Sequence, residues 1–199
     1  MNIRLQYDLD FLAGVYYEER LQMNRYTVSL NLLTNSRDSA STNIALDRAK
    51  AFVHGALEST VFINQANQER AEFMQMIGIN VTTLPEEPVD QIVGMMLYYK
   101  LNAVMEQRMT VTGLDIASSL GDNVWYQHDE DDLSGSFAED GWWHRASMQH
   151  ESIESEPVPD NVVKVIPTGW YELNLDWPEN LAPAVDNTIV YGKFPRNEK

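Results

Sequence analysis

Alternating hydrophobic and polar residues dominate the start of the chain. Tyr26, Val28, Leu30 and Leu32 alternate with Thr, Ser and Asn, which predicts a strand with one buried face. An earlier alternation over residues 3–11 predicts its partner strand. The segment that joins them, AGVYYEERLQMN, is long for a tight hairpin and therefore suggests a helical turn between the strands.

A helical pattern follows a polar stretch. Apolar residues recur at helical spacing and predict a helix over 42–57, with Ser41 or Thr42 as its N-cap. The β-branched run over 59–63 then predicts a short strand.

Two further helices are predicted before the middle of the chain. Asn64 is a candidate cap for the first of them, and Gly78 is expected to end it. After a short extended stretch over 80–84, a long apolar stripe predicts a helix over 86–107. Acidic residues crowd its first turn, where the helix dipole favours negative charge. We expect this helix to form the centre of the core.

The second half begins with strands. Residues 109–116 alternate in two phases separated by Gly113, which predicts a strand with a bulge at that glycine. A Gly-Asp-Asn turn follows, so 124–128 should return as the antiparallel partner. Near the C-terminus, residues 162–166 and 170–175 flank a Pro-Thr-Gly turn and predict a β-hairpin.

These elements together predict an α+β fold. We expect an antiparallel sheet covered by two or three helices, chiefly those at 42–57 and 86–107. Residues 1–128 would form this core domain, 129–160 an acidic loop or lid, and 161–199 a C-terminal β extension packed on the core.

Composition places the chain among globular proteins of a reducing compartment. Its 199 residues are 44% hydrophobic and include no Cys, which excludes disulfides and thiolate-bound metals. No apolar segment is typical of a signal peptide or of a membrane span. We therefore expect a soluble, cytoplasmic protein, located in the host cytoplasm or the virion if it is viral.

Negative charge is concentrated in one segment. The net charge is −16, and residues 129–160 contain ten acidic residues and one basic residue. The electrostatic field of this negative charge repels nucleic-acid phosphates and anionic membranes, so neither nucleic acid nor a membrane is an expected partner. A basic protein surface is an expected partner, and an acidic decoy that mimics nucleic acid is one interpretation of the segment.

Few residues suggest catalytic or metal chemistry. No nucleotide-binding glycine loop, nucleophile elbow or His-Glu-x-x-His motif occurs, so we assign no catalytic residue and no cofactor. His128-x-Glu130 with His144 or His150 imitates a two-His-one-carboxylate iron site, but a solvated loop explains the same residues. The acidic run fails the Ca²⁺-loop spacing, and we expect no metal site. The run consists of Asp129, Glu130, Asp131 and Asp132.

Two adjacent tryptophans lie within the acidic segment. Trp142 and Trp143 cannot both face one side of a strand. One interpretation is that the segment packs over the core through them. The other is contact with a partner chain, where Trp is enriched. With the acidic run, they are our candidate partner contacts.

The order of the predicted elements resembles the tunnelling fold of 6-pyruvoyl and 6-carboxytetrahydropterin synthases. The resemblance covers about residues 3–128 and includes the stretches NRYTVSLNL and LDRAKAFV. It implies a pterin- or purine-like ligand and a pocket between subunits. Those enzymes hold zinc with His on the first two strands, whereas the first His here is His54. No catalytic residue transfers, and the zinc chemistry would be missing.

Three functions follow from these observations. The first is a non-enzymatic, homo-oligomeric interaction or assembly protein. A phage origin is one expectation for it, because phrases such as LGDNVWYQHDEDD resemble those of acidic tailed-phage proteins. The second is a metal-independent small-molecule binder or enzyme on a tunnelling-type fold. The third is the acidic decoy. Carboxylates beside an aromatic residue in a pocket would favour the second function, and a flat apolar patch would favour the first.

Overall fold

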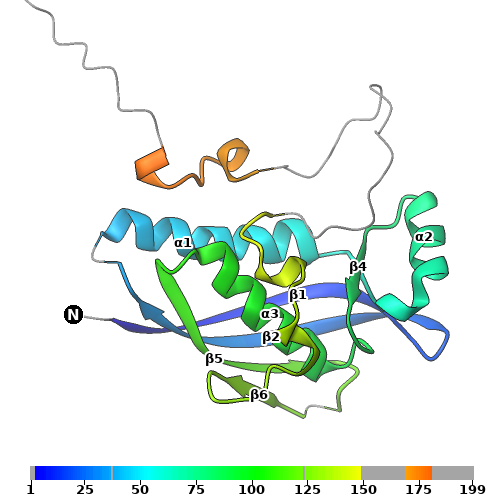
Figure 1. The fold of residues 1–199 in the computed structure, drawn as a ribbon. Helices are drawn as coiled ribbons and strands as arrows, with labels where there is room; N and C mark the ends of the chain where they lie inside the picture. Colours follow the sequence, from blue (N-terminus) through cyan, green and yellow to red (C-terminus); the bar gives the residue numbers. More distant parts are fainter. Residues whose placement is uncertain (1–2, 37, 123, 149–168, 181–199) are drawn as a thin grey trace, which may run out of the picture.

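A computed structural model describes residues 3–36, 38–122, 124–148 and 169–180. The chain forms an α+β fold in which helices pack on a six-stranded sheet (Figure 1). The strands are β1 (Arg4–Tyr17), β2 (Arg20–Thr34), β3 (Val61–Asn64), β4 (Val81–Leu84), β5 (Met109–Ser118) and β6 (Tyr126–Asp129). The helices are α1 (Ser39–Phe52), α2 (Gln68–Met76) and α3 (Asp90–Met105).

The sheet is mixed rather than purely antiparallel, so that part of the prediction is wrong. Its order is β4-β3-β1-β2-β5-β6, and the pairs β1–β2, β2–β5 and β5–β6 are antiparallel. The pairs β1–β3 and β3–β4 are parallel. The chain reaches β4 from β3 through α2, and a helical crossover returns the chain in its original direction.

The β1–β2 hairpin is longer than the sequence pattern predicts. Its strands continue to Tyr17 and from Arg20, so the expected helical turn between them is wrong. Glu18 and Glu19 form a two-residue turn with φ of 48° and 61°. Positive φ at both positions is typical of a type I′ turn, which matches the twist of the strands. Glutamates are unusual there, which is why the pattern did not reveal the turn.

Helix α1 begins earlier than predicted. The Asp38 side chain accepts hydrogen bonds from the backbone N–H groups of Ala40 and Ser41, so Asp38 is the N-cap instead of Ser41 or Thr42. The helix then continues as a π-helical turn over Val53–Leu57.

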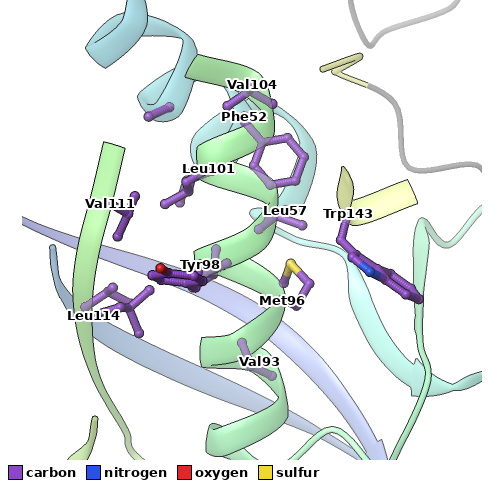
Figure 2. Close-up of a cluster of buried hydrophobic side chains, with 14 of the residues drawn as sticks. Phe52, Leu57, Val93, Met96, Tyr98, Leu101, Val104, Val111, Leu114 and Trp143 are labelled. Atoms are coloured by element: carbon purple, nitrogen blue, oxygen red, sulfur yellow. The ribbon is translucent and has the colours of Figure 1, made fainter. Parts of the chain in front are cut away.

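Helix α3 forms the centre of the core, as predicted. Met96 and Leu97 are fully buried, and Figure 2 shows Met96 on the helix among Leu57, Trp143 and neighbouring apolar side chains. The helix begins at Asp90 instead of residue 86 because Val89 has the extended backbone of an N-cap residue.

The predicted strand pair after α3 is confirmed. Asn31 pairs with Gly113 and Leu32 pairs with Val111, so Thr112 is the extra residue of a bulge beside the glycine. Strand β6 then pairs antiparallel with β5.

Helices cover both faces of the sheet. Phe62 of β3 belongs to the main core with α1 and α3, whereas its neighbours Val61 and Ile63 belong to a second cluster. Successive strand residues point to opposite faces. Helix α2 contributes Ala71 and Met74 to the second cluster, so it lies on the face opposite α1 and α3.

The described part beyond β6 packs on the helical layer through short 3-10 turns. These are Gly135–Ala138, Trp142–His144, Trp170–Leu173 and Pro178–Asn180. The prediction of a strand over 170–175, the second strand of the C-terminal hairpin, is therefore wrong, because a 3-10 turn begins at Trp170. Residues 162–166 of that hairpin lie outside the described residues, as does most of the second half of 129–160.

Candidate functional site

A pocket of about 480 Å³ opens at the N-terminus of α3. It lies on the face of the sheet that α1 and α3 cover, beyond the point where β5 stops pairing with β2. Its wall is mainly apolar, and Asp90 is the one charged residue among the described residues that line it. The lining residues are Val15, Tyr17, Gln22, Asn24, Pro88, Val89, Asp90, Gln91, Leu120, Gly121, Val124 and Tyr126.

Asn24 holds the loop that closes one side of this pocket. It is buried on β2, and its Oδ1 accepts hydrogen bonds from Ser119 Oγ (2.9 Å) and the Leu120 backbone N–H (3.1 Å). The backbone N–H of Arg25 donates to Ser119 Oγ at 3.1 Å. The 119–124 loop is thus tied to the end of the long hairpin.

Two buried hydroxyl groups of residues that do not line the pocket have no hydrogen-bond partner among the described residues. They belong to Tyr26 and Ser118, which are direct register partners on β2 and β5 and therefore share a face of the sheet. Tyr26 is fully buried and Ser118 is 5% exposed. A buried polar group without a partner is costly, so such pairs are rare without a functional reason.

Burial raises the pKa of the Tyr26 phenol above its usual range, and the charge of Asp90 raises it further. Asn24 opposes this shift, although its side chain does not reach hydrogen-bond geometry with the phenol. The phenol is therefore protonated at neutral pH and available as a donor.

The Asp90 carboxylate lies against Gly121. A Cβ atom on Gly121 would overlap the carboxylate and would stand 3.3 Å from Ser118 Oγ. Asp90 is also the first residue of α3, where the helix dipole stabilises a negative charge. Gly121 therefore leaves the space that the Asp90 carboxylate occupies.

A second cavity, of about 430 Å³, lies on the other side of Tyr17. Its lining is polar and contains three glutamates and one arginine. No unpartnered buried group of the described residues faces it. The lining residues are Tyr16, Tyr17, Glu18, Glu19, Asn67, Arg70 and Glu87.

The acidic run was predicted to contact a partner. Two of its carboxylates instead accept hydrogen bonds from backbone N–H groups of the same run. Asp132 Oδ2 accepts from the Asp129 N–H at 3.0 Å, and Asp129 Oδ1 accepts from the Asp131 N–H at 3.0 Å. Glu130 is exposed. These bonds stabilise the turn after β6, and a role in partner binding stays a prediction.

Among the described residues, His128 and His144 do not form a metal site with nearby carboxylates. Tyr99 lies against both His128 and His144, with ring-centroid distances of 6.1 and 5.4 Å. Within the described residues, no group of three or more potential ligands could hold a metal ion. His150 lies outside these residues.

Trp142 and Trp143 pack on the core and are each 7% exposed. Trp142 Nε1 donates to the Thr83 carbonyl at 3.1 Å, and Trp143 Nε1 donates to the Phe137 carbonyl at 3.3 Å. The segment therefore covers the domain through its aromatic residues, and contact of either tryptophan with a partner chain stays a prediction.

Comparison with known proteins supports only the fold. Neither a known protein family nor a curated protein matches the sequence. The structure is similar to an uncharacterised protein from Wolinella succinogenes, with 10% identity and a TM-score of 0.48 over 66% of this chain and 99% of that chain.

It is also similar to 6-pyruvoyl tetrahydropterin synthases, as the order of elements led us to expect. The Plasmodium vivax enzyme has 12% identity and a TM-score of 0.42 over 64% of this chain and 97% of its own. The Plasmodium falciparum enzyme has 13% identity and a TM-score of 0.42 over 64% and 96%. At these identities the similarity concerns the fold alone and assigns no activity.

Sequence reasoning missed Asp90 in the pocket and the unpartnered phenol of Tyr26, which does not line it. Tyr26 fitted a buried strand position, and Asp90 fitted the acidic first turn of a helix, so each already had a structural explanation. Their proximity depends on the register of β2 with β5 and on the path of the 119–124 loop. The one available signal was Tyr26 itself, because a phenol on a buried strand face needs a hydrogen-bond partner.

Proposed function

We propose that this protein binds a small organic molecule, without a metal ion, in the pocket at the N-terminus of α3. One observation carries the proposal: the carboxylate of Asp90 lines a mainly apolar pocket together with the aromatic rings of Tyr17 and Tyr126. Such pockets, with few polar groups in an apolar lining, are typical of ligand sites. A carboxylate beside aromatic residues is also the feature expected of a binder instead of an assembly protein.

A fragment experiment tests this function. Neutral, cationic and anionic aromatic fragments would be added to isotope-labelled protein while backbone resonances are followed. We expect at least one fragment to shift the resonances of Val15, Leu120 and Val124. Gly121→Ala should abolish these shifts, because its methyl group displaces the Asp90 carboxylate.

Gly55→Ala is the matched control, because Gly55 lies far from the pocket lining and its added methyl group meets only the flexible end of Met148. The control should retain the shifts. The proposal is wrong if no fragment shifts the lining resonances, or if Gly121→Ala responds as the wild type does.

A second candidate function, homo-oligomeric assembly, is favoured by an open sheet edge. Strand β1 pairs with β3 only through Gly14 and Val15, so the β1 edge over residues 4–11 lacks a neighbouring strand among the described residues. Open edges pair readily with another chain. A second copy of this chain is the proposed occupant, and the apolar side chain of Leu5, 40% exposed, lies on this segment.

Sedimentation tests the assembly. We expect species larger than the 22.8 kDa monomer, and Leu5→Lys should shift them toward monomer. Leu133→Lys, at a 90% exposed position far from this edge, should not. A monomer at all concentrations and at raised salt would contradict this function. A phage origin, a location in cytoplasm or virion, a basic partner and the decoy role stay predictions.

A further inference from the structure

We infer that two copies of this chain exchange residues 169–180, so that the segment of each copy docks on the other copy. The receiving surface, called the docking surface below, consists of Arg48 on α1 and the residues that end α3, Glu106 and Arg108. The segment is known to fit this surface, because the chain's own segment lies there, beside α1 (Figure 1). The inference rests on neither proposed function, since it involves neither the α3 pocket nor the β1 edge.

The segment docks through side-chain anchors, as a peptide ligand does. Within the described chain it forms two short 3-10 turns and pairs with no strand of the sheet. Trp170 and Trp177 are 8% and 2% exposed, and Trp170 Nε1 donates to the Ala146 carbonyl at 2.7 Å. Leu173 and Leu175 pack against the main core. Buried tryptophans of this kind typically supply much of the binding energy of an interface.

Two arginines of the docking surface contact the same tryptophan. The guanidinium carbons of Arg48 and Arg108 lie 3.9 and 4.4 Å from the ring centroid of Trp177. Cation–π contacts are strongest where water is excluded, and Arg48 is 1% exposed. Arg48 Nε also donates to the Leu175 carbonyl at 2.7 Å. The docking surface therefore recognises both a ring and a backbone carbonyl of the segment.

Charge complementarity directs the segment to this surface. Residues 169–180 contain three acidic residues and no basic residue. Asp176 Oδ1 lies 3.9 Å from Arg48 Nη2, and Glu179 forms an ion pair with Arg108. Because the whole chain has a net charge of −16, the segment of a second copy is repelled by the average surface of this protein and attracted by these two arginines.

Exchange avoids an entropy cost of docking within one chain. Trp170 contacts Ala146, 24 positions earlier, so docking on the same chain closes a loop. The segment of a second copy makes the same contacts without closing that loop, and such exchange is a low-cost route to a dimer. Docking on the same chain prevails in dilute solution, because a tethered segment meets its own surface at an effective concentration on the order of 1 mM. For the segment to be docked there, the Kd of the contact between two copies must be about 0.1 mM or lower.

Two full-length variants, each lacking one half of the contact, test the exchange. Trp177→Ala disables the segment and frees the docking surface, whereas Arg48→Met disables the surface and frees the segment. Neither variant docks its own segment, so their mixture should form a 1:1 complex of twice the 22.8 kDa monomer mass, with a Kd of about 0.1 mM or lower by sedimentation. Both chains also contain Leu5→Lys, which removes association through the β1 edge, and each variant alone should sediment as a monomer.

Tyr171→Ala is the matched control for Trp177→Ala. Tyr171 is an aromatic residue of the same segment, but it is 75% exposed, so its removal should leave the segment docked on its own chain. When the docking surface is free in only about a tenth of the molecules, the apparent affinity falls about tenfold. We therefore expect Tyr171→Ala to bind Arg48→Met about tenfold or more weakly than Trp177→Ala does.

Two results overturn the inference. One is a mixture that stays monomeric although both variants keep a cooperative thermal unfolding transition. The other is equal binding of Arg48→Met by Tyr171→Ala and by Trp177→Ala, because the association would then not depend on a free docking surface.

Replacement variants keep the test decisive if either protein does not fold. Arg108→Met replaces Arg48→Met, since Arg108 also contacts Trp177 and is more exposed than Arg48. The double variant Asp176→Asn with Glu179→Gln replaces Trp177→Ala, since it removes both ionic contacts of the segment with little change in shape. A replacement pair that folds and does not associate overturns the inference in the same way.

Discussion

At the scale of single residues, the molecule contains polar groups that local sequence does not explain. Tyr26 and Ser118 have hydroxyls without partners, and Lys100 has an ammonium group that is fully buried. The lysine is satisfied by the protein itself, because its Nζ donates to the carbonyls of Trp142 (3.0 Å), Arg145 (2.7 Å) and Ser147 (2.8 Å). The two hydroxyls have no partner among the described residues and belong to residues that do not line the pocket, so only the lysine is explained by the fold.

Removing the Tyr26 hydroxyl should stabilise the free protein. Tyr26→Phe keeps the ring that stacks on Phe11 at 4.9 Å and deletes an unsatisfied buried group, so we expect the free energy of unfolding to rise by about 1 kcal/mol. Tyr99→Phe is the control, because its hydroxyl donates to Ser134 Oγ at 2.6 Å and its loss should cost about 1 kcal/mol. Urea denaturation measures both, and a destabilised Tyr26→Phe would show that the hydroxyl has a partner within the fold.

The burial of Lys100 should appear in the pH dependence of stability. Burial lowers the pKa of Lys100 to about 7, from 10.5 in an exposed lysine. Between these values the unfolded chain binds more protons than the folded one, so the free energy of unfolding should rise as the pH rises from about 7 toward 10. The three carbonyl acceptors favour the ammonium form and limit the size of this rise.

Lys100→Met isolates the contribution of this lysine, since other groups also titrate in the range. The variant should be less stable at pH 7 by about 1–3 kcal/mol, because three carbonyls lose their donor, and should lack the additional rise with pH. Parallel slopes for the variant and the wild type between pH 7 and 10 would contradict the lowered pKa.

At the scale of elements, close packing of α3 on β5 positions both the core and the pocket. Gly94 lies where a Cβ atom would stand 2.9 Å from Ile116 Cγ2 and 3.4 Å from Leu114 Cδ2. The glycine therefore lets the helix approach the strand, and the N-terminus of the helix reaches the 119–124 loop. Apolar periodicity predicted the helix and the strand, but the distance between them depends on this one position.

Gly94→Ala should destabilise the protein although alanine favours helix formation. The added methyl group overpacks the helix–strand contact, so we expect a net loss of about 1–3 kcal/mol in the free energy of unfolding. Gly55→Ala, where only the end of Met148 must move, should be neutral or slightly stabilising. Chemical denaturation of the two variants compares them directly, and equal effects would argue against a tight α3–β5 contact.

At the scale of the whole molecule, one buried arginine joins distant parts of the chain. Arg48 Nε donates to the Leu175 carbonyl at 2.7 Å, and Nη1 donates to Glu106 Oε1 at 2.7 Å. Its guanidinium also stacks on Trp177 and Trp170, at 3.9 and 4.8 Å from the ring centroids. Described residues 169–180 are thereby attached to α1 and to the end of α3.

Replacing this arginine should release the C-terminal segment. Arg48→Met keeps most of the apolar volume but removes the hydrogen bonds of the guanidinium, including the one to Leu175, and the stacking cation, so we expect new proteolytic cleavage within 169–180. Lys50→Met, on the exposed side of the same helix, is the control and should preserve the wild-type pattern. Identical cleavage of Arg48→Met and the wild type would show that the segment is held by other contacts.

Local sequence determined most of the elements of this protein. Alternation of apolar and polar residues predicted β2 and β5, and apolar residues at helical spacing predicted α1 and α3. Gly113 predicted the bulge in β5. These features could be predicted because each depends on residues a few positions apart in the chain. Tertiary structure decided the parallel pairing of β3, the turn at Glu18 and the 3-10 turn at Trp170. It also created the candidate site, since the pocket's lining residues on β1, β2 and α3 are far apart in the chain and come together only through strand pairing and helix packing.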